Sequence, residues 1–242
     1  MLRPMRPWVC VALFLGLGGC IGHKSTAKVV DPKLQADGEM LERTGGKRGD
    51  FDLGAYHFEQ TTLDRTPAPN ASTGLSPDGL ARPSERVDLT MAMRVDGRAW
   101  TGRCKALREP TGRQDYAAVT EEFHDVVTID CTFEDGTGGS WVFAMQGSLA
   151  ANLGGTLTPQ HASFVGGRLE VEVLMWRSVY DRIRRHLPHA VGQVRLRDTT
   201  VAAMILARPE QAWRAVETPP EMLDASMVVL GALRMLPLGF EG

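Results

Sequence analysis

The sequence has no surplus of positive charge and no hydrophobic run long enough to form a membrane-spanning helix. Lysine and arginine together number 27, against 29 aspartates and glutamates, which gives a formal net charge of −2. General nucleic-acid binding requires clustered positive charge, so this class of function is excluded. A membrane-spanning helix needs about 20 consecutive apolar residues, and every apolar run in the sequence is shorter.

The motifs of the common enzyme classes are also missing. The sequence contains no GxSxG, no HExxH, no phosphate-binding loop and no dinucleotide fingerprint. The best cluster of reactive side chains is EEFHD, in which Glu121, Glu122, His124 and Asp125 offer a base or metal ligands. Glu121 and Asp125 would share one face of a helix, a spacing equally typical of a solvated charged surface. We therefore predict no catalytic, cofactor-binding or metal-binding residue.

The first residues have the layout of a secretory signal peptide. Arg3 and Arg6 precede an apolar stretch from Trp8 to Leu17, and about ten residues is the length expected of a signal-peptide core. A buried core helix is the other reading, but Gly16, Gly18 and Gly19 would each cost roughly 0.8 to 1 kcal/mol in a helix interior. We predict a signal peptide over residues 1–19.

The sequence LGGC, from Leu17 to Cys20, resembles the lipobox of bacterial lipoprotein precursors. The resemblance implies that Cys20 becomes the mature N-terminus and carries a thioether-linked diacylglycerol and an amide-linked chain such as palmitate. Two or three acyl chains anchor a protein stably in a membrane, whereas one gives only marginal binding. Because Ile21 is not aspartate, the resemblance also implies sorting to an outer membrane, facing the periplasm or the cell surface.

Two cysteines remain once the signal peptide is removed and Cys20 is acylated. These are Cys104 and Cys131, and an isolated pair in an exported chain favours a disulfide. A pair of metal-binding or redox thiols is the competing interpretation, but it lacks a CxxC spacing and an adjacent histidine. We therefore predict a disulfide between Cys104 and Cys131.

Two polar stretches divide the rest of the chain. Residues 20–50 contain few aliphatic side chains and many charges, a composition that does not offset its ordering entropy. We predict a lipidated flexible tether there and a single globular domain over 51–242. Within that domain, the proline-rich residues 66–86 predict a disordered loop, because long loops in compact domains are uncommon.

The globular part has the alternating pattern of β-strands. Val87, Leu89, Met91, Met93 and Val95 are apolar at every second position. Asp96-Gly97 follows and is typical of a two-residue hairpin turn. The same alternation runs from Val127 to Phe133, from Trp141 to Met145 and from Leu169 to Met175. The pattern predicts a mainly β (α+β) fold with antiparallel strands.

Helical spacing occurs in two places. Trp176, Tyr180, Ile183 and Leu187 predict an amphipathic helix. After Pro219-Pro220, a second helix is apolar all round, with Arg234 as its only charge from Ala225 to Leu236. A helix apolar on every side is buried. The strands GQVRLRD and TVAAMILA with this last helix resemble the tubby and LURP-one fold, a closed sheet around a C-terminal helix. We predict a barrel of this kind or a sandwich capped by the helix.

Three functions remain open. The first is a non-enzymatic envelope lipoprotein, attached to the membrane by its lipid and using its β domain to bind an envelope protein or to support the cell surface. The second is a carrier of lipid or another hydrophobic ligand, which requires a cavity. The third is a hydrolase that uses Glu121, His124 and Asp125. The tubby and LURP-one resemblance implies contact with lipid or phosphoinositide, and no binding residue is transferred from it.

Overall fold

The structure is a computed structural model that describes residues 29–45, 49–68, 74–75, 81–82, 84–112, 123–149, 151–160, 167–176, 189–206 and 211–238. The predicted signal peptide and Cys20 lie outside these residues. The helices and strands are α2 (Pro32–Asp37), β1 (Glu39–Thr44), β2 (Asp50–Leu53), β3 (Tyr56–Pro67), β4 (Gly74–Leu75), β5 (Ala81–Arg82), β6 (Glu85–Val95), β7 (Arg98–Gly112), β8 (Phe123–Asp135), β9 (Ser140–Ser148), β10 (Leu153–Pro159), β11 (Leu169–Trp176), β12 (His189–Leu196), β13 (Thr199–Ile205), β14 (Gln211–Arg214) and α4 (Pro220–Met235).

Twelve of these strands close into one antiparallel barrel, in the order β1-β14-β13-β12-β11-β10-β9-β8-β7-β6-β3-β2. The alternating apolar residues line its interior, as the burial of Val87, Leu89, Met91 and Met93 on β6 shows. The predicted Asp96-Gly97 turn is confirmed: both residues have positive φ, at 47° and 79°, and Val95 pairs with Arg98. Of the two predicted architectures, the barrel is the one observed.

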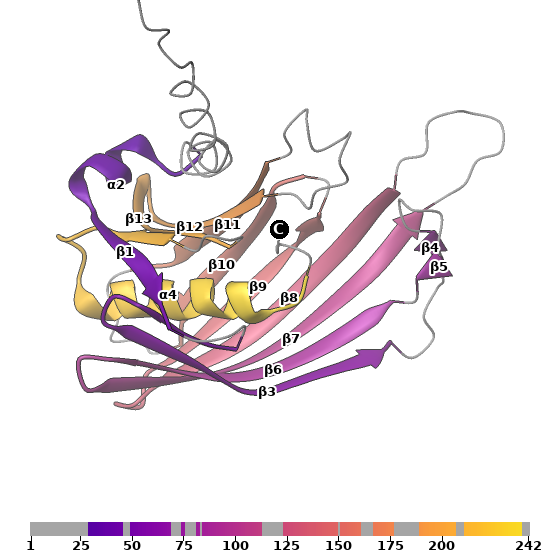
Figure 1. Ribbon diagram of the computed structural model, residues 1–242, viewed down its shortest axis with the longest axis horizontal. Coiled ribbons are helices and arrows are strands. Elements are labelled where there is room, and N and C mark those ends of the chain that lie inside the picture. The colour runs from indigo at the N-terminus through magenta and orange to yellow at the C-terminus, as the bar shows by residue number, and fades with distance from the viewer. Residues whose placement is uncertain are drawn as a thin grey trace, which may run out of the picture.

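Helix α4 lies inside the barrel. It runs through the interior in Figure 1, and every residue from Met222 to Met235 is buried. The prediction of a buried C-terminal helix is therefore confirmed. Within the described residues, neither helix is both long and apolar enough to cross a membrane.

The helix and the barrel wall lie very close together at Gly231. A Cβ added there would lie 2.6 Å from Cδ1 of Phe58 and closer still to Cε1. Phe58 is stacked on Phe51 with ring centroids 4.7 Å apart, so its ring has little room to move. Glycine is required here because the helix and the ring approach too closely for any side chain.

We expect Gly231→Val to destabilise the barrel by about 2 to 3 kcal/mol, the usual cost of overpacking a filled core. Gly154→Val is the matched control, because nothing lies within 4 Å of a Cβ at Gly154. Denaturant unfolding of the two variants measures the difference. Equal midpoints would contradict the close approach.

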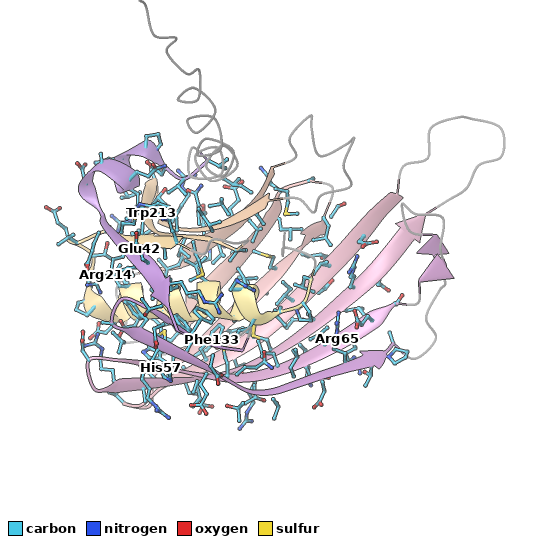
Figure 2. All side chains as sticks on the ribbon, viewed as in Figure 1. Glu42, His57, Arg65, Phe133, Trp213 and Arg214 are labelled. Carbon is cyan, nitrogen blue, oxygen red and sulfur yellow. A yellow bond between two sulfur atoms is a disulfide. The ribbon has the colours of Figure 1, made fainter. Side chains whose placement is uncertain are left out.

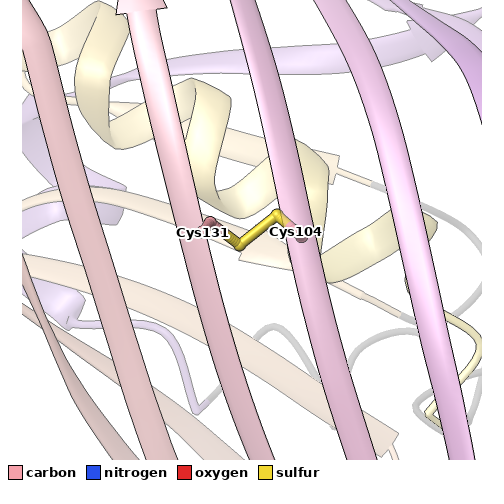
Figure 3. Close-up of a disulfide and its surroundings, with 2 residues drawn as sticks. All are labelled: Cys104 and Cys131. Carbon is pink, nitrogen blue, oxygen red and sulfur yellow. A yellow bond between two sulfur atoms is a disulfide. The ribbon is translucent and has the colours of Figure 1, made fainter.

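The disulfide joins neighbouring strands inside the barrel. Cys104 on β7 and Cys131 on β8 face each other in register, with the sulfur atoms 2.08 Å apart. Figure 3 shows the bond crossing between the two strands, with α4 behind it. Both cysteines are buried, and so is Trp100, which lies on the same face of β7 as Cys104. The predicted pairing is confirmed.

The prediction of a flexible tether over residues 20–50 is wrong in its second half. Residues 29–38, which we call the strap, contain helix α2 and lie against the outer face of the barrel (Figure 1). Strand β1 follows directly and pairs with β14 and β2. The segment is polar on average, but a few of its apolar residues pack against the barrel. A prediction from average composition does not detect these contacts.

Two buried side chains hold the strap in place. Val30 and Leu34 are 0% and 4% exposed and pack on the outward side chains of β12, β13 and β14, which are Val191, Ala203, Ile205 and Trp213. Burying a valine and a leucine contributes about 3 to 6 kcal/mol as an upper estimate. The strap is therefore a stable part of the barrel.

Hydrogen bonds add to this apolar contact. Asp31 caps α2 by accepting from the backbone N–H of Lys33 at 2.8 Å, and its other oxygen accepts from Oγ1 of Thr200 at 2.8 Å. Gln193 Nε2 donates to the carbonyl of Val29 at 3.1 Å. The Thr200 hydrogen bond is the main cause that lowers the pKa of Asp31, although burial opposes it.

We expect Asp31→Ala to cost about 1 kcal/mol at neutral pH, the usual value of a helix cap. Because the pKa of Asp31 is lowered in the folded protein, its contribution is present above the ordinary aspartate pKa of about 4 and is lost as the pH falls further. Denaturant midpoints of the wild type and Asp31→Ala should therefore converge in acid. Asp37→Ala, at an exposed position of the same helix, is the control. A difference independent of pH would contradict this account.

The predicted loop over residues 66–86 is also shorter than expected. Strand β3 continues to Pro67 and β6 begins at Glu85, and these two residues pair with each other. Strands β4 and β5 form a separate two-stranded sheet between them. The helix predicted from Trp176 falls on residues 177–188, outside the described residues, and Trp176 itself ends β11.

Candidate functional site

A pocket opens at the end of the barrel where α4 begins, and we call it the mouth pocket. Its volume is about 240 Å³. Strand β1, the β6–β7 turn, the end of β14 and the first turn of α4 meet there. The residues that line it are Glu39, Tyr56, Asp96, Arg98, Arg214, Val216, Thr218, Pro220, Leu223 and Asp224.

An ion pair joins the helix to the barrel wall in this pocket. Arg98 Nε donates to Oδ2 of Asp224 at 2.6 Å. The side chain of Asp224 is 2% exposed, whereas that of Arg98 is 41% exposed. The hydrogen bond to Asp224 raises the pKa of Arg98. One side of the guanidinium thus satisfies a buried carboxylate, and the other side faces the pocket and the solvent.

A second arginine connects β14 to β1 and to a buried tyrosine. Arg214 lies 2.7 Å from Oε2 of Glu39, and its Nη1 donates to the hydroxyl of Tyr56 at 3.2 Å. The Arg214 guanidinium also lies over the Tyr56 ring, 5.6 Å from its centroid. Burial raises the pKa of Tyr56, so its hydroxyl stays protonated at neutral pH. The pocket therefore combines two paired arginines, a neutral phenol and three carboxylates.

Exposed apolar side chains border this end of the barrel. Val216 is 69% exposed and lines the pocket, and Met40, next to Glu39 on β1, is 49% exposed. These are the only large hydrophobic side chains that the described residues leave exposed. Apolar groups beside arginine and tyrosine are typical of protein-binding surfaces.

The other end of the barrel carries a row of alternating charges on the inner face. Arg65 Nε lies 2.8 Å from Oε1 of Glu85, Glu85 pairs in register with Arg108, and Arg108 Nε donates to Asp125 at 2.7 Å. Glu85 and Asp125 continue the inward positions of Val87 and Val127. Arg65 also donates to the carbonyl of Pro237 at 3.5 Å, just after α4. Figure 2 shows Arg65 and Arg214 at opposite ends of the barrel.

The predicted Glu121, His124 and Asp125 cluster is placed only in part. Glu121 lies outside the described residues, and the structure describes no side chain for His124. Asp125 lies on strand β8 and not on a helix, because the β7–β8 ladder continues as far as Gly112 and Phe123. Its carboxylate is bonded to Arg108. The expectation of a shared helix face at these positions is wrong.

Among the described residues, no three histidine, cysteine or acidic side chains converge as metal ligands. A second hollow of about 410 Å³ lies on the outer face of β10 and β11, where Glu170, Glu172 and Arg195 border Gly154 and Gly155. It is a shallow part of the sheet surface and brings fewer charged groups together than the mouth pocket does.

Sequence reasoning missed the mouth pocket, although two signals pointed to it. Arg98 follows directly after the predicted Asp96-Gly97 turn, and Asp224 immediately precedes the apolar stretch of the last helix. A carboxylate at the start of a buried helix needs a partner. No sequence pattern near Asp224 identifies Arg98 as that partner, because the two residues are 126 positions apart. Comparison with known proteins adds no further candidate: no family model, no curated protein and no solved structure matches this chain.

Proposed function

We propose that this protein is a lipid-anchored, non-enzymatic envelope protein whose β-barrel binds a partner at its mouth pocket. The resemblance of Leu17 to Cys20 to a lipobox supports the anchor and the placement in a bacterial envelope, at the outer membrane. The mouth pocket supports the binding part, and it is the observation that carries the proposal.

The chemistry of the pocket suits recognition of a protein surface. Arg98 and Arg214 are already held by carboxylates, so they present charges in fixed positions. Fixed charges of both signs select a partner of complementary pattern. The exposed Val216 supplies an apolar contact beside them. We take an envelope protein with a mixed charged and apolar surface as the partner.

The filled interior weighs against a carrier of hydrophobic ligands. Such a carrier needs a cavity, and here Phe58, Leu230 and Leu233 belong to one continuous core between the helix and the wall. The resemblance to the tubby and LURP-one fold stays part of the proposal. The closed sheet around α4 supports it, and it assigns no lipid-binding residue to this chain.

Labelling with a radioactive fatty acid tests the anchor. In a bacterial host, we expect the wild type to be labelled and processed, and Cys20→Ala to be unlabelled and to keep its N-terminal segment. Cys10→Ala is the matched control and should be labelled as the wild type is. Label retained by Cys20→Ala would refute the lipid attachment.

Photo-crosslinking in living cells tests the binding part. A photoreactive amino acid at Val216, on the border of the mouth pocket, should give a discrete adduct with another envelope protein. The same amino acid at Asp130, an exposed position on β8, should not. Identical adducts at both positions, or none at Val216, would remove the support for the mouth pocket as a binding surface.

A further inference from the structure

The strap limits how far the barrel can stand from a membrane that holds Cys20. A tether from Cys20 to Asp50 would span about 100 Å when fully extended. The strap, however, is packed on the barrel from Val29 onward. The chain from Cys20 to Val29 spans at most about 30 Å, whatever conformation it adopts.

Apolar packing and hydrogen bonds both hold the strap on the barrel. Val30 and Leu34 are buried on the outer face of β12, β13 and β14. Asp31 and Thr200 hydrogen-bond at 2.8 Å across the interface. The strap then continues without interruption into β1, whose residues pair with β14. Among the described residues, the chain is therefore attached to the barrel from Val29 onward.

The mouth pocket lies beside the strap. Gly38 is the C-cap of α2, and the next residue, Glu39, lines the pocket and pairs with Arg214. The pocket therefore lies next to the C-terminal end of the strap, at the end of the barrel that adjoins the β12–β14 wall.

We propose that the strap keeps this barrel close to the bilayer surface. The β12–β14 side, where the strap is attached, lies within about 30 Å of the lipid headgroups. The mouth pocket, next to the strap, then opens close to the membrane. This inference rests on the proposed anchor at Cys20. It implies that the partner of the mouth pocket is met at the membrane surface and not at a distance from it.

A chemical anchor tests this geometry independently of natural lipidation. In the mature chain, Cys104 and Cys131 are bonded to each other, so Cys20 is the only free thiol. The mature protein is coupled through Cys20 to maleimide lipids in a supported phosphatidylcholine bilayer. Neutron reflectometry then measures the water-rich gap between the headgroups and the protein layer.

Two double variants and one insertion variant are compared with the wild type. Val30→Ser with Leu34→Ser removes the apolar contacts of the strap, and Lys33→Ser with Ala36→Ser changes exposed positions of the same helix. Release of the strap moves the first attached residue from Val29 to Glu39, and the chain from Cys20 to Glu39 spans up to about 65 Å. A long Gly-Ser insert between Lys28 and Val29 lengthens it further. Circular dichroism checks that each variant retains the barrel.

We expect a gap of no more than about 30 Å for the wild type and for the exposed-face variant, and a wider gap for the released and inserted variants. A wild-type gap above this limit would overturn the inference. So would a gap that neither strap release nor the insert changes. Failure of natural lipidation would appear instead in the fatty-acid labelling of Cys20. It would not change the reflectometry result, because the anchor in that experiment is chemical.

Discussion

Val228→Asp will unfold the barrel or leave it barely stable. Val228 is in α4 and is 0% exposed, so the new carboxylate would be enclosed by apolar side chains. An unpaired charge in such a place is either desolvated or protonated at high cost, and we expect a loss of at least about 4 kcal/mol. Since a typical domain is stable by only about 5 to 15 kcal/mol, this single change removes much of the stability.

Val216→Asp is the matched control for this prediction. The same substitution there falls on an exposed side chain outside the helix, where surface changes stay within about 0.5 kcal/mol. Denaturant midpoints of the two variants measure the difference. Two companions test the same point: Leu230→Ala should cost about 2 to 5 kcal/mol, and deletion of residues 221–242 should leave no folded barrel. A folded deletion variant with an unchanged midpoint would show that α4 is not the core.

Removing the disulfide by Cys104→Ala with Cys131→Ala will have the second largest effect. The two cysteines are 27 residues apart, and the chain-entropy estimate for a loop of this size is about 3.5 kcal/mol. The loss arises mainly because the unfolded chain gains freedom, since the two strands remain paired along β7 and β8.

Reductant provides the control for the disulfide. The midpoint of the wild type should fall toward that of the double variant when the bond is reduced under denaturing conditions, while the double variant should not respond. Mass spectrometry of the non-reduced protein should find no free thiol at either position. Two free thiols, or a double variant as stable as the oxidised wild type, would contradict the prediction.

The sequence by itself determined the local elements and their apolar faces. Alternation at every second residue identified β6 and its neighbours, because successive side chains on a strand face opposite sides. Asp96-Gly97 identified the turn, because both residues adopt positive φ there. The apolar surface all round α4 required burial. The disulfide followed from the count of cysteines and the expected compartment.

Tertiary structure alone decided how these elements close and where charges meet. The barrel is completed by the pairing of β1 with β14, whose residues Glu39 and Arg214 are far apart in the sequence. The strap and the pair of Arg98 with Asp224 also join distant segments. A hydrophobic pattern reports which face of one element is buried, but it does not name the element that buries it. The mouth pocket and the attachment of the strap to the barrel wall therefore emerge only when the chain is folded.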